Sequence, residues 1–227
     1  MLVLGFDTST PAVTVALGRV AARGVTGAVD ADILAETTEV ASNRHGELLG
    51  PLIEKVLRAG GVRPAALAAV AVGTGPGPFT GLRVGIVTAK AMADALGIPA
   101  YGQPSLTLLT RADAGVATNA RRKQVYWAVL RDSTIVAGPE IDLPQIAAQR
   151  FVAAGVGAVC GEGPQLYPAE FAACTTMPDC EYPRAALLVA SVARRAWDGA
   201  PADDLQPLYL RRPDASPPGR PKAVTPR

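Results

Sequence analysis

Residues 69–96 read AVAVGTGPGPFTGLRVGIVTAKAMADAL, and the rest of the chain is organised around them. Ala69–Gly73 is a Val-rich apolar run, which is typical of a buried strand. Thr74–Phe79 alternates glycine with proline, and Thr80 is a good N-cap for the helix formers that follow it. The stretch therefore predicts a strand, a rigid turn and a helix. The N-terminus of such a helix offers free N–H groups and the positive end of a dipole.

The glycine-proline turn departs from the known phosphate-binding loops. A Walker loop needs Lys followed by Ser or Thr straight after its last glycine, whereas Gly81 is followed by Leu-Arg. A dinucleotide fingerprint that begins at Gly75 would require glycine in place of Thr80. We expect the prolines to stiffen the turn, and Gly75 and Gly77 to supply unusual dihedral angles or a close backbone approach.

The predicted helix has a face of small residues spaced four apart: Gly81, Gly85, Ala89 and Ala93. Arg83, Lys90 and Asp94 lie on a different face, which should be in contact with solvent. Each glycine inside a helix costs about 1 kcal/mol relative to alanine. We therefore expect another helix, in this chain or in a partner, to approach the small-residue face closely.

Composition limits the class of protein. With 227 residues and 49% hydrophobic content, the chain can bury a core as one domain or two small subdomains. Its three cysteines lack CxxC spacing, so neither a disulfide framework nor a zinc site is predicted. The start MLVLGFDTST predicts a first strand and not a signal peptide. No apolar helix is long enough to span a bilayer, so we expect no membrane contact and a cytoplasmic location.

Charge is distributed unevenly along the chain. Residues 211–227 hold five basic side chains and one acid, whereas residues 1–210 hold 17 basic and 19 acidic ones. A slightly acidic body is a poor independent binder of nucleic acid. The basic end is also rich in proline, which predicts a disordered tail.

The order of elements suggests mixed sheets. Apolar runs at 2–6 and 12–18 predict a hairpin, 29–39 a third strand, and Ser42 or Asn43 the cap of a helix that ends near residue 58. The apolar positions of this helix cover about half of its circumference, more than one core normally needs: Leu48, Leu49, Leu52, Ile53, Val56 and Leu57. Further strands are predicted at 98–101, 125–130, 135–141 and 158–160, and helices at 105–111, 144–152 and 185–197.

His45 is the only histidine of the sequence. A His–His metal pair and an HExxH motif are therefore excluded, and we expect His45 to be a surface or packing residue. A hydrolase that used it would also need a nucleophile, and no GxSxG elbow is present.

Asp7 ends the first strand, where sugar-kinase-like and actin-like folds carry a metal-associated carboxylate. The alternative is a structural cap of the following turn through the amides of Thr8 or Ser9. We favour the cap, because the comparable later stretch, residues 118–123 (TNARRK), has neither glycine nor carboxylate.

Five segments, FDTST, HGELLGPLI, GTGPGPFTGLRVGIVTAKAMA, ARRKQVYWA and LQPLYLRR, follow one another in the order and spacing of a known family. The chain resembles the TsaB family, also called YeaZ, almost throughout up to Arg212, and GPGPFTGLR is the most specific piece. The resemblance implies an α/β fold of the actin-like, ribonuclease-H-like (ASKHA) type, in which each of two subdomains has a mixed sheet flanked by helices. We expect these subdomains at 1–102 and 103–210, followed by the tail at 211–227.

The resemblance also implies a function. It implies a non-catalytic subunit that is needed for the synthesis of threonylcarbamoyladenosine (t6A) in bacterial tRNA, and that pairs with the transferase TsaD and recruits the ATPase TsaE. The chain would then reach tRNA only through the complex, could form a homodimer without TsaD, and would have no catalytic, cofactor or metal residues. The alternative is a free-standing ATP-dependent enzyme of the sugar-kinase and actin superfamily, with Asp7 holding magnesium.

For the partner surface we expect the two helices of the first subdomain to contribute His45, Leu48, Leu49, Leu52, Ile53, Val56, Gly81, Gly85, Ala89 and Ala93. The family motif loop comprises Asp7, Gly75, Gly77, Phe79, Thr80 and Arg83. One position departs from the family pattern: Asn119 stands where members commonly have Asp before the Ala-Arg pair.

Overall fold

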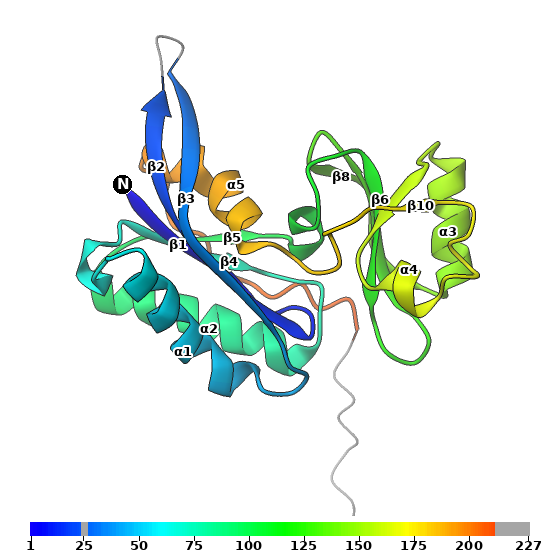
Figure 1. Ribbon diagram of the computed structural model, residues 1–227, viewed down its shortest axis with the longest axis horizontal. Coiled ribbons are helices and arrows are strands. Elements are labelled where there is room, and N and C mark those ends of the chain that lie inside the picture. Colours follow the sequence, from blue (N-terminus) through cyan, green and yellow to red (C-terminus); the bar gives the residue numbers. More distant parts are fainter. Residues whose placement is uncertain (24–26, 212–227) are drawn as a thin grey trace, which may run out of the picture.

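The computed structural model describes residues 1–23 and 27–211, which form two lobes side by side (Figure 1). The first lobe is built on a sheet in the order β3-β2-β1-β4-β5. Its strands are β1 (Leu2–Asp7), β2 (Ala12–Arg23), β3 (Ala28–Val40), β4 (Ala69–Gly73) and β5 (Ala100–Gln103). The first three pair antiparallel and the last two join in parallel, which confirms the predicted hairpin and mixed sheet.

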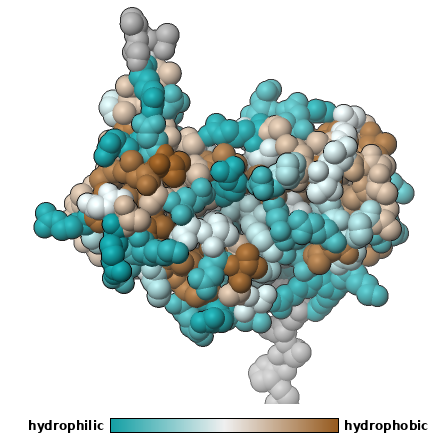
Figure 2. Space-filling view, in the orientation of Figure 1, coloured by the Kyte–Doolittle hydropathy of each residue, from teal (hydrophilic) through white to brown (hydrophobic). Residues whose placement is uncertain are grey.

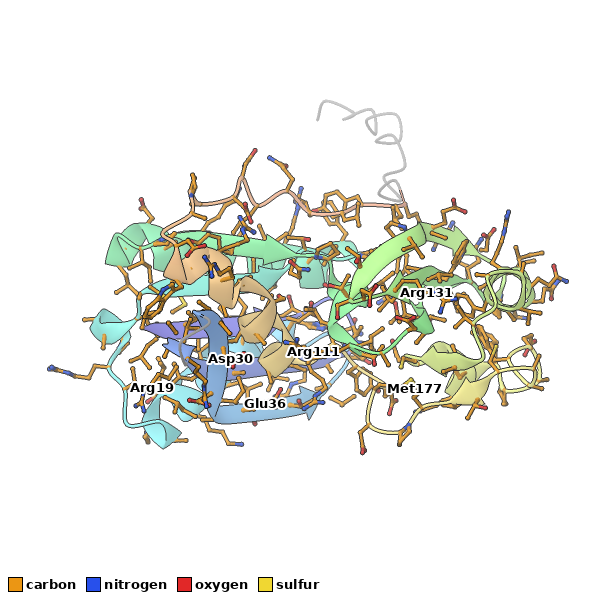
Figure 3. The ribbon with its side chains drawn as sticks, turned by 90° about the horizontal axis from the view of Figure 1, so that it is seen from above. Arg19, Asp30, Glu36, Arg111, Arg131 and Met177 are labelled. Carbon is orange, nitrogen blue, oxygen red and sulfur yellow. The ribbon has the colours of Figure 1, made fainter. Side chains whose placement is uncertain are left out.

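Helices cover both faces of this sheet (Figure 1). On one face lie α1 (His45–Ala59) and α2 (Phe79–Leu96), and on the other lies α5 (Ala185–Trp197). Side chains of β1 alternate between two hydrophobic cores, one on each face of the sheet. Leu4 and Phe6 belong to the core beneath α1 and α2, and Val3 belongs to the core beneath α5. Glu36 of β3 lies at the start of α5 (Figure 3), where its carboxylate accepts a hydrogen bond from the N–H of Ala186 at 3.1 Å.

The second lobe repeats the same strand order on a second sheet, β10-β9-β6-β7-β8. Its strands are β6 (Ala114–Asn119), β7 (Val125–Arg131), β8 (Thr134–Asp142), β9 (Ala158–Cys160) and β10 (Thr175–Thr176). The helices α3 (Pro144–Ala153) and α4 (Gly163–Leu166) belong to this lobe, and the short 3-10 helices η1 (Pro64–Ala66) and η2 (Ser105–Leu108) lie in connections. Again three antiparallel strands are extended by two parallel ones.

Two predicted helix caps are wrong. Helix α2 begins at Phe79 after an extended Pro78, so Thr80 lies inside its first turn and does not cap it. The N-cap of α1 is Arg44, and neither Ser42 nor Asn43 caps the helix through a side chain. Both long helices of the first lobe therefore begin without a side-chain cap.

The chain crosses between the lobes twice. Helix α5 falls within the range expected for the second subdomain, yet it packs against all five strands of the first sheet. The subdomain limits at 102 and 210 stay a prediction. The tail at 211–227 was predicted to be disordered. All of its residues except Arg211 lie outside the described part of the chain. Within the described residues, no helix is long and apolar enough to cross a membrane.

Candidate functional site: the Asp7 turn and the pocket between the lobes

Asp7 is a buried turn residue with a full set of hydrogen bonds. It is 1% exposed, and its Oδ1 accepts hydrogen bonds from the backbone N–H of Ser9 at 2.8 Å and from the Ser9 hydroxyl at 2.7 Å. Its Oδ2 accepts a hydrogen bond from the hydroxyl of Ser105 at 2.5 Å. The predicted cap through the Ser9 amide is confirmed, and Ser105 is a further partner that the sequence did not indicate.

The environment of Asp7 disfavours its charge. Burial raises the pKa of the Asp7 carboxyl above its ordinary value, while the hydrogen bonds from Ser105 and Ser9 act in the opposite direction. Among the described residues, no group of three or more His, Cys, Asp or Glu side chains could hold a metal ion. Through its hydrogen bond with Ser105, the Asp7 side chain holds the end of β1 against the segment that follows β5.

The glycine-proline turn lies directly beside Asp7. Gly75 has a φ of +98°, which side chains rarely tolerate, and its N–H donates to the Ser105 hydroxyl at 2.9 Å. A Cβ atom on Gly77 would lie 2.2 Å from the carbonyl oxygen of Ser9. The expectation of one unusual dihedral angle and one close backbone approach is confirmed.

The small-residue face of α2 packs against the chain's own turn after β1. A Cβ on Gly81 would lie 2.4 Å from the carbonyl oxygen of Thr8, and one on Gly85 would lie 2.5 Å from the Thr8 hydroxyl. That hydroxyl donates to the carbonyl of Gly81 at 2.8 Å. Ala89 is fully buried in the same core. The expected approach of another helix to this face is wrong, because Thr8 and the strands β1 and β4 occupy the space.

The apolar face of α1 is buried by its own lobe. Six side chains are each at most 8% exposed: Leu48, Leu49, Leu52, Ile53, Val56 and Leu57. The prediction that the apolar face of α1 is wider than one core can bury is wrong, because this face packs on three elements of its own lobe, β2, β3 and α2. A partner would meet the opposite side of α1, where residues such as Gly50 and Pro51 are exposed.

A pocket of about 450 Å³ opens between the two lobes. Its walls come from the turn after β1, the first turns of α1 and α2, the β6–β7 turn and the C-terminal segment. His45 lines it and donates from Nε2 to the carbonyl of Thr10 at 2.7 Å, so the histidine joins α1 to the β1–β2 turn. Of the expected motif loop, Gly77, Phe79 and Thr80 line the pocket, whereas Asp7, Gly75 and Arg83 are not among its lining residues.

The C-terminal segment ties the lobes together at this pocket. The Tyr209 ring packs on Phe79 with centroids 4.9 Å apart, and Arg83 lies 3.8 Å over the same Phe79 ring. Two residues further along the chain, Arg211 donates to the carbonyl of Ala120 at 2.9 Å and to the side chain of Gln124. Sequence reasoning missed Tyr209 and Arg211 because the contacts join segments about 90 residues or more apart.

Glu162 is the second buried carboxyl of the structure. It follows β9, is 6% exposed, and accepts a long hydrogen bond of 3.4 Å from the N–H of Asn119. Burial, reinforced by the nearby Glu181, raises the pKa of Glu162 to about 7. Asn119 itself uses its side-chain oxygen to hold the N–H of Arg121 at 2.8 Å. The departure from the family's Asp therefore preserves a turn-forming acceptor without its charge.

Comparisons with known proteins agree with this fold. A family model described as TsaD, tRNA N6-adenosine threonylcarbamoyltransferase, matches residues 33–156. The tRNA threonylcarbamoyladenosine biosynthesis protein TsaB of Escherichia coli is 30% identical over 184 residues, which cover 74% of each chain. YeaZ from Pseudomonas aeruginosa superimposes with a TM-score of 0.70 and 27% identity over 92% of this chain and 99% of that one.

An uncharacterized protein of Mycobacterium leprae is 42% identical over 221 residues. These residues cover 95% of this chain but 56% of the relative, so the chain spans little more than half of that protein's length. Two lobes whose sheets have the same strand order, with the GPGPFTGLR turn and helix start of the first lobe on the pocket between them, define an actin-like α/β protein. The chain belongs to the TsaB (YeaZ) family.

Proposed function

We propose that this protein acts in the biosynthesis of t6A in tRNA as a non-catalytic subunit that pairs with TsaD and recruits the ATPase TsaE. The observation that carries the proposal is the likeness to E. coli TsaB over 74% of both chains, together with the YeaZ fold over 92% of this one. The tRNA would be reached only through the complex. The cytoplasmic location expected from the sequence stays a prediction.

The state of Asp7 supports a non-catalytic role. An actin-like enzyme needs a carboxylate that is free to organise a metal ion, whereas the Asp7 oxygens are hydrogen-bonded to Ser9 and Ser105 inside the protein. The β6–β7 turn, which faces the β1–β2 turn across the pocket, presents arginine and lysine and no carboxylate. Both features favour the subunit over the alternative, an ATP-dependent enzyme with magnesium on Asp7.

The exposed sides of α1 and α2 are the surface that we propose for TsaD. Val87 on α2 is 61% exposed, although it is a large aliphatic side chain. On α1, a Cβ at Gly50 would meet nothing within 4 Å, so the helix backbone is open to a close neighbour. Figure 2 shows apolar groups as separate patches among polar side chains, so a contact here would have a limited apolar centre. Without TsaD, the same surface would serve a homodimer.

The test measures TsaD affinity and melting temperature on the same variants. Val87→Asp should leave the melting temperature unchanged and weaken TsaD binding at least tenfold, because a charge would be buried in the contact. The matched control is Val152→Asp on α3, which changes a valine of similar exposure (55%) on the other lobe and should leave TsaD binding intact. If both variants bind TsaD as tightly as the native protein, the proposed surface is wrong.

A measurement of magnesium-dependent ATP hydrolysis distinguishes the proposed subunit from the alternative, an ATP-dependent enzyme. The native chain alone should not hydrolyse ATP, and adding TsaD and TsaE should yield a ternary complex on size-exclusion chromatography. Hydrolysis by the isolated chain that disappears on Asp7→Asn would favour the enzyme instead.

A further inference from the structure

The pocket between the lobes has a positive charge that the proposed function does not use. Arg121 and Arg211 line it, and none of the described residues in its wall is Asp or Glu. We propose that this pocket binds a small molecule that carries an oxyanion, a carboxylate or a phosphate, and that it does so without a metal ion. This proposal is independent of the pairing with TsaD.

Tyr126 supplies a hydroxyl group that is open to this pocket. It comes from β7, lines the pocket and is 6% exposed. Its hydroxyl has no hydrogen-bond partner in the part of the chain that the structure describes. Burial raises the pKa of Tyr126, against the opposing effect of Arg211 and Arg121, so the hydroxyl keeps its proton. A phenol whose ring is buried and whose hydroxyl opens on a pocket, without a partner in the protein, can donate to a bound ligand.

Two helix N-termini face the same space. His45 and Gly46 of α1 line the pocket, as do Phe79, Thr80 and Gly81 of α2. The two helices have 15 and 18 residues, and neither begins with a side-chain cap. Their first N–H groups and their dipoles therefore add positive potential to that of the arginines, which suits an anion.

The β6–β7 turn has a well-defined backbone at Arg121, which lines the pocket. Arg121, Arg122 and Lys123 have φ values of +59°, +50° and +59°, three successive left-handed residues that are not glycine. The turn is closed by Gln124 N–H to Arg121 carbonyl at 2.9 Å and by the Asn119 side chain. The Arg121 guanidinium has no ion-pair partner among the described residues and is free to meet a ligand.

The shape of the pocket favours a small molecule. A volume of about 450 Å³ lies within the range of pockets for small ligands. Phe79 and Tyr209 form an aromatic wall, so the ligand would combine an oxyanion with a less polar part. Because no carboxylate in the described wall could hold a cation, charge neutralisation comes from the guanidinium groups.

The proposal is tested by calorimetry on the full chain, titrated with inorganic phosphate and, separately, with malonate, in the presence of EDTA. At least one of the two should bind saturably, and the tighter one identifies phosphate or carboxylate as the preferred group. Tyr126→Phe and Arg121→Gln should each weaken that binding about tenfold, because each removes one hydrogen-bond donor to a charged group. Their melting temperatures without ligand should equal that of the native protein.

Two matched controls lie on the second lobe outside the pocket. Tyr167→Phe and Arg150→Gln make the same chemical changes there and should leave the affinity unchanged. The proposal is overturned if neither phosphate nor malonate binds through the millimolar range, or if the controls weaken binding as much as the pocket variants. None of these measurements needs TsaD, so their failure would leave the proposed function as it stands.

Discussion

A Cβ atom placed on Gly73 would lie 1.7 Å from Oδ2 of Asp7. The last residue of β4 is thus a glycine because the buried carboxylate of the neighbouring strand occupies the space of a side chain. Gly73→Ala would displace Asp7 from Ser9 and Ser105 and leave its buried carboxyl group without hydrogen-bond partners. We expect this to lower the unfolding free energy by more than about 2 kcal/mol.

Chemical denaturation measures this cost, and Gly50→Ala is the matched control. Gly50 lies inside α1 with nothing near its Cβ, so alanine there should stabilise by about 0.5–1 kcal/mol. Equal effects of the two substitutions would contradict the packing described for Asp7.

Ala89→Leu should lower the melting temperature of the isolated protein. Ala89 is fully buried between α2 and the first sheet, and overpacking of a well-packed core costs about 1–3 kcal/mol. Ala91→Leu, two residues further along the same helix, changes an exposed side chain and should be nearly neutral. A native melting temperature for Ala89→Leu would mean that this face is not core.

Glu162 makes stability fall as the pH rises. Its pKa is raised from 4.5 to about 7 in the folded protein, so the folded state binds the proton more tightly than the unfolded state does. Between those values the unfolding free energy decreases with pH, by up to about 3 kcal/mol, and the loss is complete above pH 7. Glu162→Gln should flatten this slope, whereas Glu170→Gln at an exposed position should not. Urea denaturation from pH 4 to pH 8 measures the slope.

The C-terminal contacts between the lobes should be measurable by hydrogen exchange. Arg211→Ala removes the donors to Ala120 and Gln124, so the amides of the β6–β7 turn should exchange about tenfold faster. Arg150→Ala on the exposed side of α3 is the control for loss of an arginine. Unchanged exchange in the turn would show that Arg211 does not hold it.

The first lobe could be predicted from patterns within short stretches of sequence. The run from Ala69 to Leu96 carries its own strand, turn and helix pattern, and the glycines at 75 and 77 indicated an unusual dihedral angle or a close backbone approach. Asp7 was interpretable as a cap because its partner Ser9 is two residues away.

Contacts across the chain were beyond the reach of sequence patterns. Helical spacing showed that Gly81 and Gly85 share a face, but not that this face meets Thr8 more than 70 residues earlier. The strand Ala114–Asn119 was missed because its small residues show no alternation of apolar and polar side chains. The pocket combines Tyr126 from β7, the helix starts of the first lobe and the C-terminal segment, so no single stretch could reveal it.

The placement of α5 has a consequence for synthesis on the ribosome. The face of the first sheet formed by Val3, Ala16 and Tyr101 is covered by α5, which is translated only after the entire second lobe. A nascent chain that has completed its first 103 residues therefore presents a bare apolar sheet face for the time needed to make some eighty more. A stop codon or a protease cut before residue 185 would leave that face permanently open, and such fragments should aggregate or be bound by chaperones.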